Sequence, residues 1–307
     1  MRWPVLDYRA ERDVYESIHA WLQVIGKLPT RTKPWRNHGW HVALRVVPRG
    51  FRTYVLPAGD DDYELMFDVQ SEAVRLWSSD GKFASFSLTG QTVAAFTSEL
   101  TAALAEIGAL APLSGGPNEV EEAIPFHQDD RPRVWNADVA RRLHGAFRSV
   151  DRVFEDFRSG FVGKSSPSHL FWGSFDLAVT RFSGREAPRH PGGFPNLPDE
   201  VTREAYSHEV VSAGFWSGGG GIEEAAIYAY TYPAVEAFKN KPVRPGNASW
   251  HDGLGEYVLP YEALRKADDP DAALMTFLQS TYEVGAKALD FPDGLTVPTG
   301  PVGQPPR

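Results

Sequence analysis

Acid, base and phenol side chains recur along three strand-like segments in the C-terminal half of the sequence. The segments are Leu170–Phe182, Tyr206–Trp216 and Ala226–Tyr232. Each contributes one candidate: Asp176, His208 and Tyr230 respectively. Histidine titrates near neutral pH and can move a proton, and a carboxylate can orient it or tune its pKa. We therefore expect His208 to act as acid or base, Asp176 as its orienting carboxylate, and Tyr230 as a proton donor or substrate contact.

The alternation of side chains along a strand places further aromatic residues beside these three candidates. The expected substrate-binding residues are Trp172, Tyr206, Tyr228 and His169. Aromatic walls with a few polar groups suit a pocket for a small molecule. The alternative is a polar face that is exposed to solvent or docks against the other half or another chain, because Tyr, Trp and Thr are common strand residues.

Several side chains that can bind metals are present, but their spacing does not predict a metal site. They are His38, His41, His169, His190, His208 and Glu209. No pair has the spacing of a His-Glu-x-x-His helix, and His208 and Glu209 are neighbours that point to opposite faces of a strand. The sequence therefore predicts no metal ligands, and it names no cofactor.

The elements that must position these residues follow from hydrophobic periodicity. A helical pattern covers Asp13–Leu28, with Gly26 as a candidate end, and strand-like alternation follows between Trp40 and Leu88. Asn136 is a suitable N-cap for a long helix, and Asp269-Pro270 is a typical start for the last one.

Both halves thus combine helices with a strand meander, which predicts an α+β fold of two helix-flanked antiparallel sheet halves. The expected parts are an N-terminal half at 1–111, a linker at 112–134, a C-terminal half at 135–290 and a loose tail at 291–307. Gly26-Lys27 precedes Trp40 as Gly163-Lys164 precedes Trp172, which favours a pseudo-repeat. The alternative is that Gly-Lys is simply a common helix stop.

Composition narrows the class of partner. The chain has 307 residues, no cysteine and a net charge of -9, which argues against nucleic acid or an anionic membrane as partner. The sequence has no run of about 20 apolar residues, and Met1–Asp7 lack the apolar core of a signal peptide. We expect a soluble, cytoplasmic protein with a small molecule as partner, and the oligomeric state stays open.

Four longer motifs carry a family resemblance. They are Asn37–His41, Gly163–Arg185, Arg203–Glu209 and Gly214–Trp216 with the glycine run Gly218–Gly221. From Trp3 to Ala288 the chain resembles a bacterial family known as domain of unknown function 5996. The family has no assigned activity, so the resemblance implies no catalytic residue. The residues themselves favour a small-molecule-binding enzyme, with a non-catalytic ligand-binding or protein-interaction module as the alternative.

Overall fold

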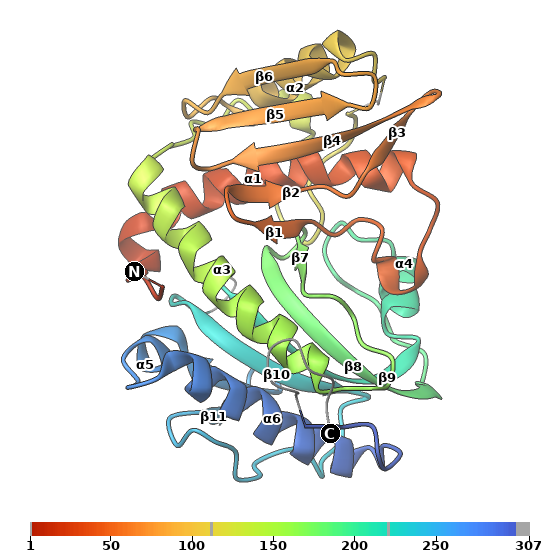
Figure 1. Ribbon diagram of the computed structural model, residues 1–307, viewed down its shortest axis with the longest axis vertical. Helices are drawn as coiled ribbons and strands as arrows, with labels where there is room; N and C mark the ends of the chain where they lie inside the picture. The colour runs from red at the N-terminus through yellow and green to blue at the C-terminus, as the bar shows by residue number, and fades with distance from the viewer. Residues whose placement is uncertain (1, 111–112, 220–221, 299–307) are drawn as a thin grey trace.

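The fold consists of two antiparallel sheets that are joined by helices (Figure 1). The computed structural model describes residues 2–110, 113–219 and 222–298. Its described elements include six α-helices and two sheets of six strands each. The predicted α+β class with two helix-flanked antiparallel sheet halves is confirmed.

The first sheet belongs to the N-terminal half and lies at the top of Figure 1. Its strands follow the order β1-β2-β4-β5-β6, with β3 paired to β4. The elements of this half are α1 (Tyr8–Thr32), η1 (Asn37–Gly39), β1 (Arg45–Val47), β2 (Gly50–Arg52), β3 (Leu56–Ala58), β4 (Asp61–Asp68), β5 (Ala73–Ser78), β6 (Phe83–Ser87) and α2 (Val93–Glu106). A short helical turn, η2 (Phe126–Gln128), follows in the linker.

The second sheet has the order β11-β12-β10-β9-β8-β7 and carries the candidate site. Its elements are α3 (Ala137–Ser159), β7 (His169–Phe171), β8 (Asp176–Glu186), α4 (Asp199–Ala205), β9 (His208–Trp216), β10 (Ala226–Tyr232), β11 (Ser249–His251), β12 (Glu256–Pro260), α5 (Tyr261–Arg265) and α6 (Pro270–Ala288). The helices α3 and α6 pack together, α3 against β8 and α6 against β9 and β10. The other face of the sheet is thereby left for the site.

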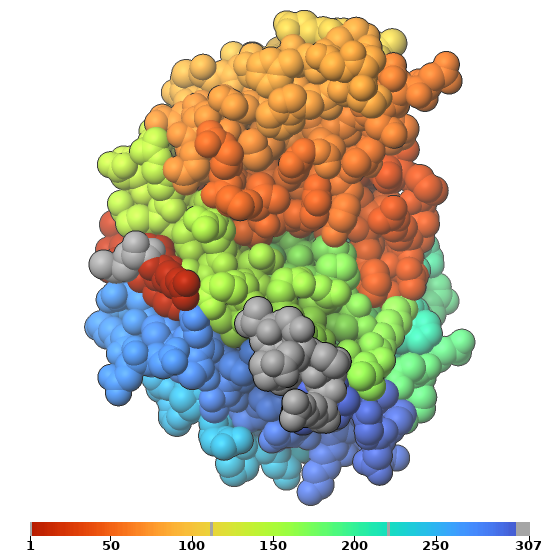
Figure 2. Space-filling model, viewed as in Figure 1, coloured from red at the N-terminus to blue at the C-terminus, as the bar shows by residue number. Residues whose placement is uncertain are grey.

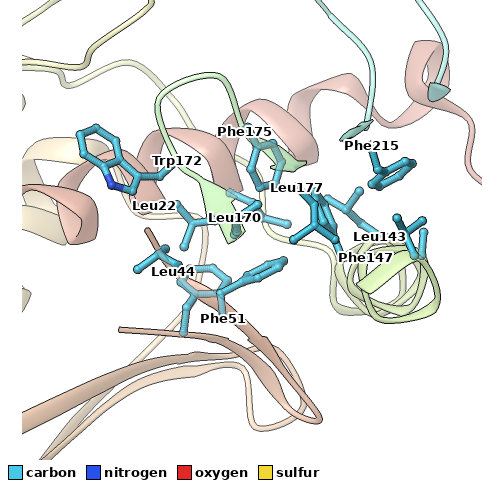
Figure 3. Close-up of a cluster of buried hydrophobic side chains, with 14 of the residues drawn as sticks. Leu22, Leu44, Phe51, Leu143, Phe147, Leu170, Trp172, Phe175, Leu177 and Phe215 are labelled. Atoms are coloured by element: carbon cyan, nitrogen blue, oxygen red, sulfur yellow. The ribbon is translucent and has the colours of Figure 1, made fainter. Parts of the chain in front are cut away.

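One buried cluster of hydrophobic side chains runs through both halves. Figure 3 shows its centre, where side chains from α1, the first sheet, α3 and the second sheet meet. The ring of Phe147 on α3 lies 5.4 Å from Phe51, 5.4 Å from Phe175 and 5.0 Å from Phe215, measured between ring centroids. Figure 2 shows the same close junction on the surface, where the green atoms of the C-terminal half contact the orange atoms of the first sheet. The halves are therefore joined by packing as well as by the linker, and the boundaries given above stay a prediction.

The first helix differs from its prediction at its end. Helix α1 continues through Gly26 to Thr32 and even contains Pro29. Gly26 is needed inside the helix because a Cβ there would overlap the indole ring of Trp172. The expectation that Gly26 ends the helix is therefore wrong, and the glycine serves the contact between the two halves instead. By contrast, the predicted N-caps are confirmed: the side chains of Asn136 and Asp269 accept backbone hydrogen bonds at the starts of α3 and α6.

The first predicted strand of the site is in fact a hairpin. Residues 172–175 form a turn between β7 and β8, with Phe175 in a left-handed conformation at φ 59°. Cross-strand pairing of Phe171 with Asp176 fixes the register of this hairpin. Trp172 and Ser174 therefore lie in a turn at the end of the sheet, and strand alternation does not explain their placement.

The segment before β1 and the predicted C-terminal tail complete the description of the fold. Residues 40–44 are expected from the sequence to form a strand with residues 45–47, but they follow the helical turn at 37–39, and only Leu44 pairs, in an isolated bridge to Leu170, before β1 begins at Arg45. In the predicted tail, the N–H of Val297 donates to the carbonyl of Gly160, whereas residues 299–307 lie outside the described chain. None of the helices within residues 2–110, 113–219 and 222–298 has the length and apolar character of a membrane span.

Candidate functional site

The face of the second sheet that points away from α3 and α6 carries polar and aromatic side chains. Neighbouring strands place Thr180, Ser212 and Tyr230 side by side across β8, β9 and β10. The hydroxyls of Thr180 and Ser212 are 2.8 Å apart and hydrogen-bond to each other. The intervening residues Leu177 and Val179 are fully buried on the opposite face. Strand alternation thus separates a polar face from the core, as the sequence predicts.

A cavity of about 800 Å³ lies on this polar face. The second sheet forms its floor, the C-terminal end of α1 and the 172–174 turn line one side, and residues 194–206 with α4 line another. Linker residues Asn118 and Glu119 also reach it. The rest of the lining is rich in aromatic rings: Trp35, Trp40, Phe171, Trp172, Phe182, Phe194 and Trp216. Cavities of roughly 300–1,000 Å³ with apolar walls and few polar groups typically hold small molecules.

Asp176 is the most enclosed acid of the cavity. Its Oδ1 accepts a hydrogen bond from the hydroxyl of Ser174 at 2.6 Å, and its Oδ2 accepts one from the phenol of Tyr228. Burial raises the pKa of the Asp176 carboxyl, and the two hydroxyl donors act in the opposite direction. Burial also raises the pKa of Tyr228, and the neighbouring Asp176 adds to this shift. The Tyr228 phenol therefore stays protonated and donates to the carboxyl.

A pair of phenols, Tyr206 and Tyr230, lies next to this group. The hydroxyls of Tyr206 and Tyr230 are 3.0 Å apart, and the rings of Tyr228 and Tyr230 stack with their centroids 6.1 Å apart. Burial raises the pKa of Tyr230 to about 12. Stacked phenols with paired hydroxyls form a rigid floor, because each hydroxyl already has a partner that fixes its position.

Two glutamates that are not among the candidate residues chosen from the sequence also line the cavity. Glu256 lies at the start of β12, and Glu119 lies in the predicted linker. Burial, together with the nearby Asp176 carboxyl, raises the pKa of each to about 7. The same alternation, applied to the strand that begins at Glu256, would have found this residue. No sequence signal would have found Glu119, which is held by its N–H donating to the carbonyl of Pro195 at 2.8 Å.

Cationic side chains lie at the end of α1. Lys27 and Arg31 are one helical turn apart, and both line the cavity. The Lys27 ammonium donates to Oδ1 of Asn118 and lies 5.3 Å from the centroid of the Trp172 ring. Burial and the neighbouring Arg31 lower the pKa of Lys27 to about 8. The surroundings of Lys27 thus stabilise its charged form less well than water does.

The structure brings together five of the seven residues that the sequence selects. Asp176, Tyr230, Trp172, Tyr206 and Tyr228 all line the cavity. Trp172 reaches it from the hairpin turn, where it fits against Gly26 and donates from Nε1 to the carbonyl of Val42 at 2.9 Å.

The two histidines of the set lie elsewhere. His208 begins β9, while Asp176 pairs with Trp216 at the far end of that strand. Eight residues of strand separate these points by about 26 Å. The ring of His208 instead meets His38 edge to face, with centroids 5.6 Å apart. The position of His208 therefore does not support its pairing with Asp176.

His169 is buried in β7 outside the cavity lining. Its Nε2 lies 3.1 Å from the hydroxyl of Tyr54 in the first half of the chain. Burial lowers the pKa of His169 to about 4, so the ring stays neutral at ordinary pH. This geometry makes His169 a link between the halves, and the substrate contact expected for it has no support from its position.

The mouth of the cavity carries large apolar side chains as well as the exposed Arg31. Trp35, Phe194 and Leu254 are exposed to solvent although they are large hydrophobic residues, and all three line the cavity. The Asn196 amide donates to the carbonyl of Val120 at 2.6 Å, which ties the 194–206 segment to the linker. Exposed apolar residues around an opening are typical of ligand-binding and interaction sites.

The carboxyls of the site do not form a recognisable metal centre. Within the part of the chain that the structure describes, no three His, Asp or Glu side chains come together in an arrangement that could hold a metal ion.

Fold and site together define an α+β protein with a ligand-sized cavity between an antiparallel sheet and the segments above it. The chain belongs to the Family of unknown function (DUF5996), whose family model matches residues 3–296. The resemblance seen in the sequence motifs is thus confirmed. No curated protein and no solved structure matches the chain.

Proposed function

We propose that the protein is an enzyme that binds a small organic molecule in the cavity and moves protons to or from it. The observation that carries the proposal is the enclosed group of Asp176, Tyr228, Glu119 and Glu256, which lines a cavity of about 800 Å³. Rings along the walls supply apolar contact, and the acids and phenols supply orientation.

Acid–base catalysis is the chemistry that this group supports best. A carboxyl whose pKa is about 7 is present in both protonation states at neutral pH, so it can give or accept a proton with little driving force lost. Glu119 and Glu256 both meet this condition. In this proposal Asp176 and Tyr228 orient the ligand through hydrogen bonds, and Glu119 or Glu256 carries the proton.

The test is a thermal-shift screen of metabolites with the wild-type protein and two variants. A ligand that binds only the folded state raises the unfolding temperature by mass action. We expect hits that stabilise the wild type and lose their effect in Asp176→Asn. Asp156→Asn is the matched control, because Asp156 is exposed on α3, away from the cavity. The absence of any stabilising compound, or hits that are equally strong in Asp176→Asn, would contradict the proposal.

A non-catalytic binding protein is the second candidate function. It is favoured by the paired hydroxyls of Tyr206 and Tyr230, which already satisfy each other and have no free role in proton transfer. Each hit is therefore incubated with a high concentration of protein and followed by NMR. Conversion of the compound in the wild type and its loss in Glu256→Gln or in Glu119→Gln would favour the enzyme, and binding without conversion of any hit would favour the second candidate.

A further inference from the structure

The cationic side chains of the cavity have no acidic partner. Lys27 and Arg31 make no salt bridge with any residue that the structure describes. Lys27 is 9% exposed, and the only polar partner of its ammonium in the described chain is the neutral Asn118 amide. A buried ammonium without a counter-charge is unfavourable unless another negative group neutralises it.

The acids of the cavity have no cationic partner either. No lysine or arginine in the described ranges makes a salt bridge with Asp176, Glu119 or Glu256. The donors to Asp176 are the neutral hydroxyls of Ser174 and Tyr228. This end of the cavity can therefore accept a positive group with a favourable Coulomb interaction.

The two groups of like charge line one cavity, and among the described residues no salt bridge joins them. Besides burial, the neighbouring charge of Arg31 lowers the pKa of Lys27, whereas the neighbouring charge of Asp176 raises the pKa of Glu119 and of Glu256. The turn at 172–174 connects the two ends: Trp172 lies against Lys27, and Ser174 donates to Asp176. Aromatic rings line much of the same cavity.

We propose that the ligand is bipolar, with an anionic group that binds Lys27 and Arg31, an ammonium group that binds Asp176 and its neighbouring glutamates, and an apolar frame in between. This inference rests on the proposed function, because it assumes that the cavity binds a small molecule. It adds the substrate class: a small amino acid in the broad sense, with an aromatic or aliphatic frame. Charge-assisted hydrogen bonds at both ends would select it over molecules with one charge.

The experiment compares molecules that share a frame but differ in charge. One set is 4-(aminomethyl)benzoate, benzylamine and benzoate, and a second, flexible set is 6-aminohexanoate, hexylamine and hexanoate. Affinities are measured by isothermal titration calorimetry with the wild type, Lys27→Met, Lys27→Arg and Asp176→Asn. Lys287→Met is the control, because Lys287 is exposed on α6 outside the cavity.

In at least one set, we expect the amino acid to bind about tenfold or more tightly than either molecule with a single charge. Lys27→Met should weaken the amino acid and the acid by a similar factor and leave the amine unchanged, and Lys27→Arg should restore part of the loss. Asp176→Asn should weaken the amino acid and the amine and leave the acid unchanged. Far-UV circular dichroism and unfolding temperatures show whether each variant is folded.

The possible failures of the two proposals differ. If the metabolite screen finds cavity ligands but neither amino acid binds more tightly than its amine and its acid, or Lys27→Met changes no affinity, the bipolar inference is wrong and the proposed function stands. If no compound of either experiment binds, both are wrong.

Discussion

Gly214 lies directly opposite Tyr228 in the ladder between β9 and β10, and the phenol ring of Tyr228 occupies the space where a side chain on Gly214 would be. The phenol thereby crosses β9 and donates to Asp176 on β8, two strands away from its own. A glycine in a central strand usually marks a close approach of this kind, because glycine otherwise weakens a strand. The hydrogen bond at the floor of the cavity thus depends on one missing Cβ.

Gly214→Ala tests this dependence. The new methyl group would overlap the Tyr228 ring, so the ring must move and its hydrogen bond to Asp176 is lost. Overpacking of this kind typically costs about 1–3 kcal/mol of the free energy of unfolding, and ligand affinity should fall with it. Urea unfolding and calorimetry measure the two effects. Gly246→Ala is the control, because its Cβ would meet no atom within 4 Å; equal effects of both substitutions would contradict the argument.

Asp176→Asn and His208→Ala separate the acid that lines the cavity from the histidine that lies outside it. The amide introduced by Asp176→Asn would keep the shape of the side chain and remove a buried charge, so we expect a folded protein whose ligand affinity is roughly tenfold lower. His208→Ala should change the affinity by less than about twofold, because His208 does not line the cavity. Calorimetry with the best ligand of the metabolite screen measures the affinity of each variant. A larger loss in His208→Ala than in Asp176→Asn would restore the role that the sequence suggests for the histidine.

The sequence predicts most of the polar face but not how its strands align. Alternation along β8, β9 and β10 is enough to find Asp176, Tyr228 and Tyr230, because side-chain direction is a local property of a strand. His208 lies far from Asp176 because it begins β9, whereas Asp176 pairs with Trp216 at the other end of that strand. Which end of a strand lies near a residue of the next strand depends on the register between the two strands. This register cannot be predicted from the alternation of side chains within a single strand.

Contacts between distant segments are the second kind of missing information. In the sequence Lys27 belongs to a typical helix stop, yet it lines the cavity because Gly26 lets the helix continue beside Trp172. Glu119 lies in the predicted linker, and it reaches the cavity because its backbone pairs with Pro195. Such placements follow from packing between the halves. This packing cannot be predicted from the hydrophobic periodicity of a single segment.

The raised pKa of Glu256 predicts a pH dependence that Glu256→Gln should remove. The folded state keeps a proton on this carboxyl up to about pH 7, whereas the unfolded chain releases it near 4.5. Between these values the folded state binds the extra proton, so the wild type should lose stability relative to Glu256→Gln as the pH rises, by about 1.4 kcal/mol per pH unit at most. Urea unfolding from about pH 4.5 to 7 measures the difference. Glu106→Gln, at an exposed position of α2, should run parallel to the wild type, and a parallel curve for Glu256→Gln would show that the carboxyl is not shifted.

Substitutions of two tryptophans of the cavity should have separate effects, one on the free energy of unfolding and the other on ligand affinity. Trp172 is buried against Gly26 and donates to the carbonyl of Val42, so Trp172→Ala should lower the free energy of unfolding by about 3–5 kcal/mol. Trp35 is half exposed at the mouth, so Trp35→Ala should change stability by less than about 0.5 kcal/mol while it weakens ligand binding. Urea unfolding and calorimetry test both statements. A stable Trp172→Ala protein would mean that the indole does not hold the halves together, and unchanged affinity in Trp35→Ala would mean that the ligand enters and binds without touching the mouth.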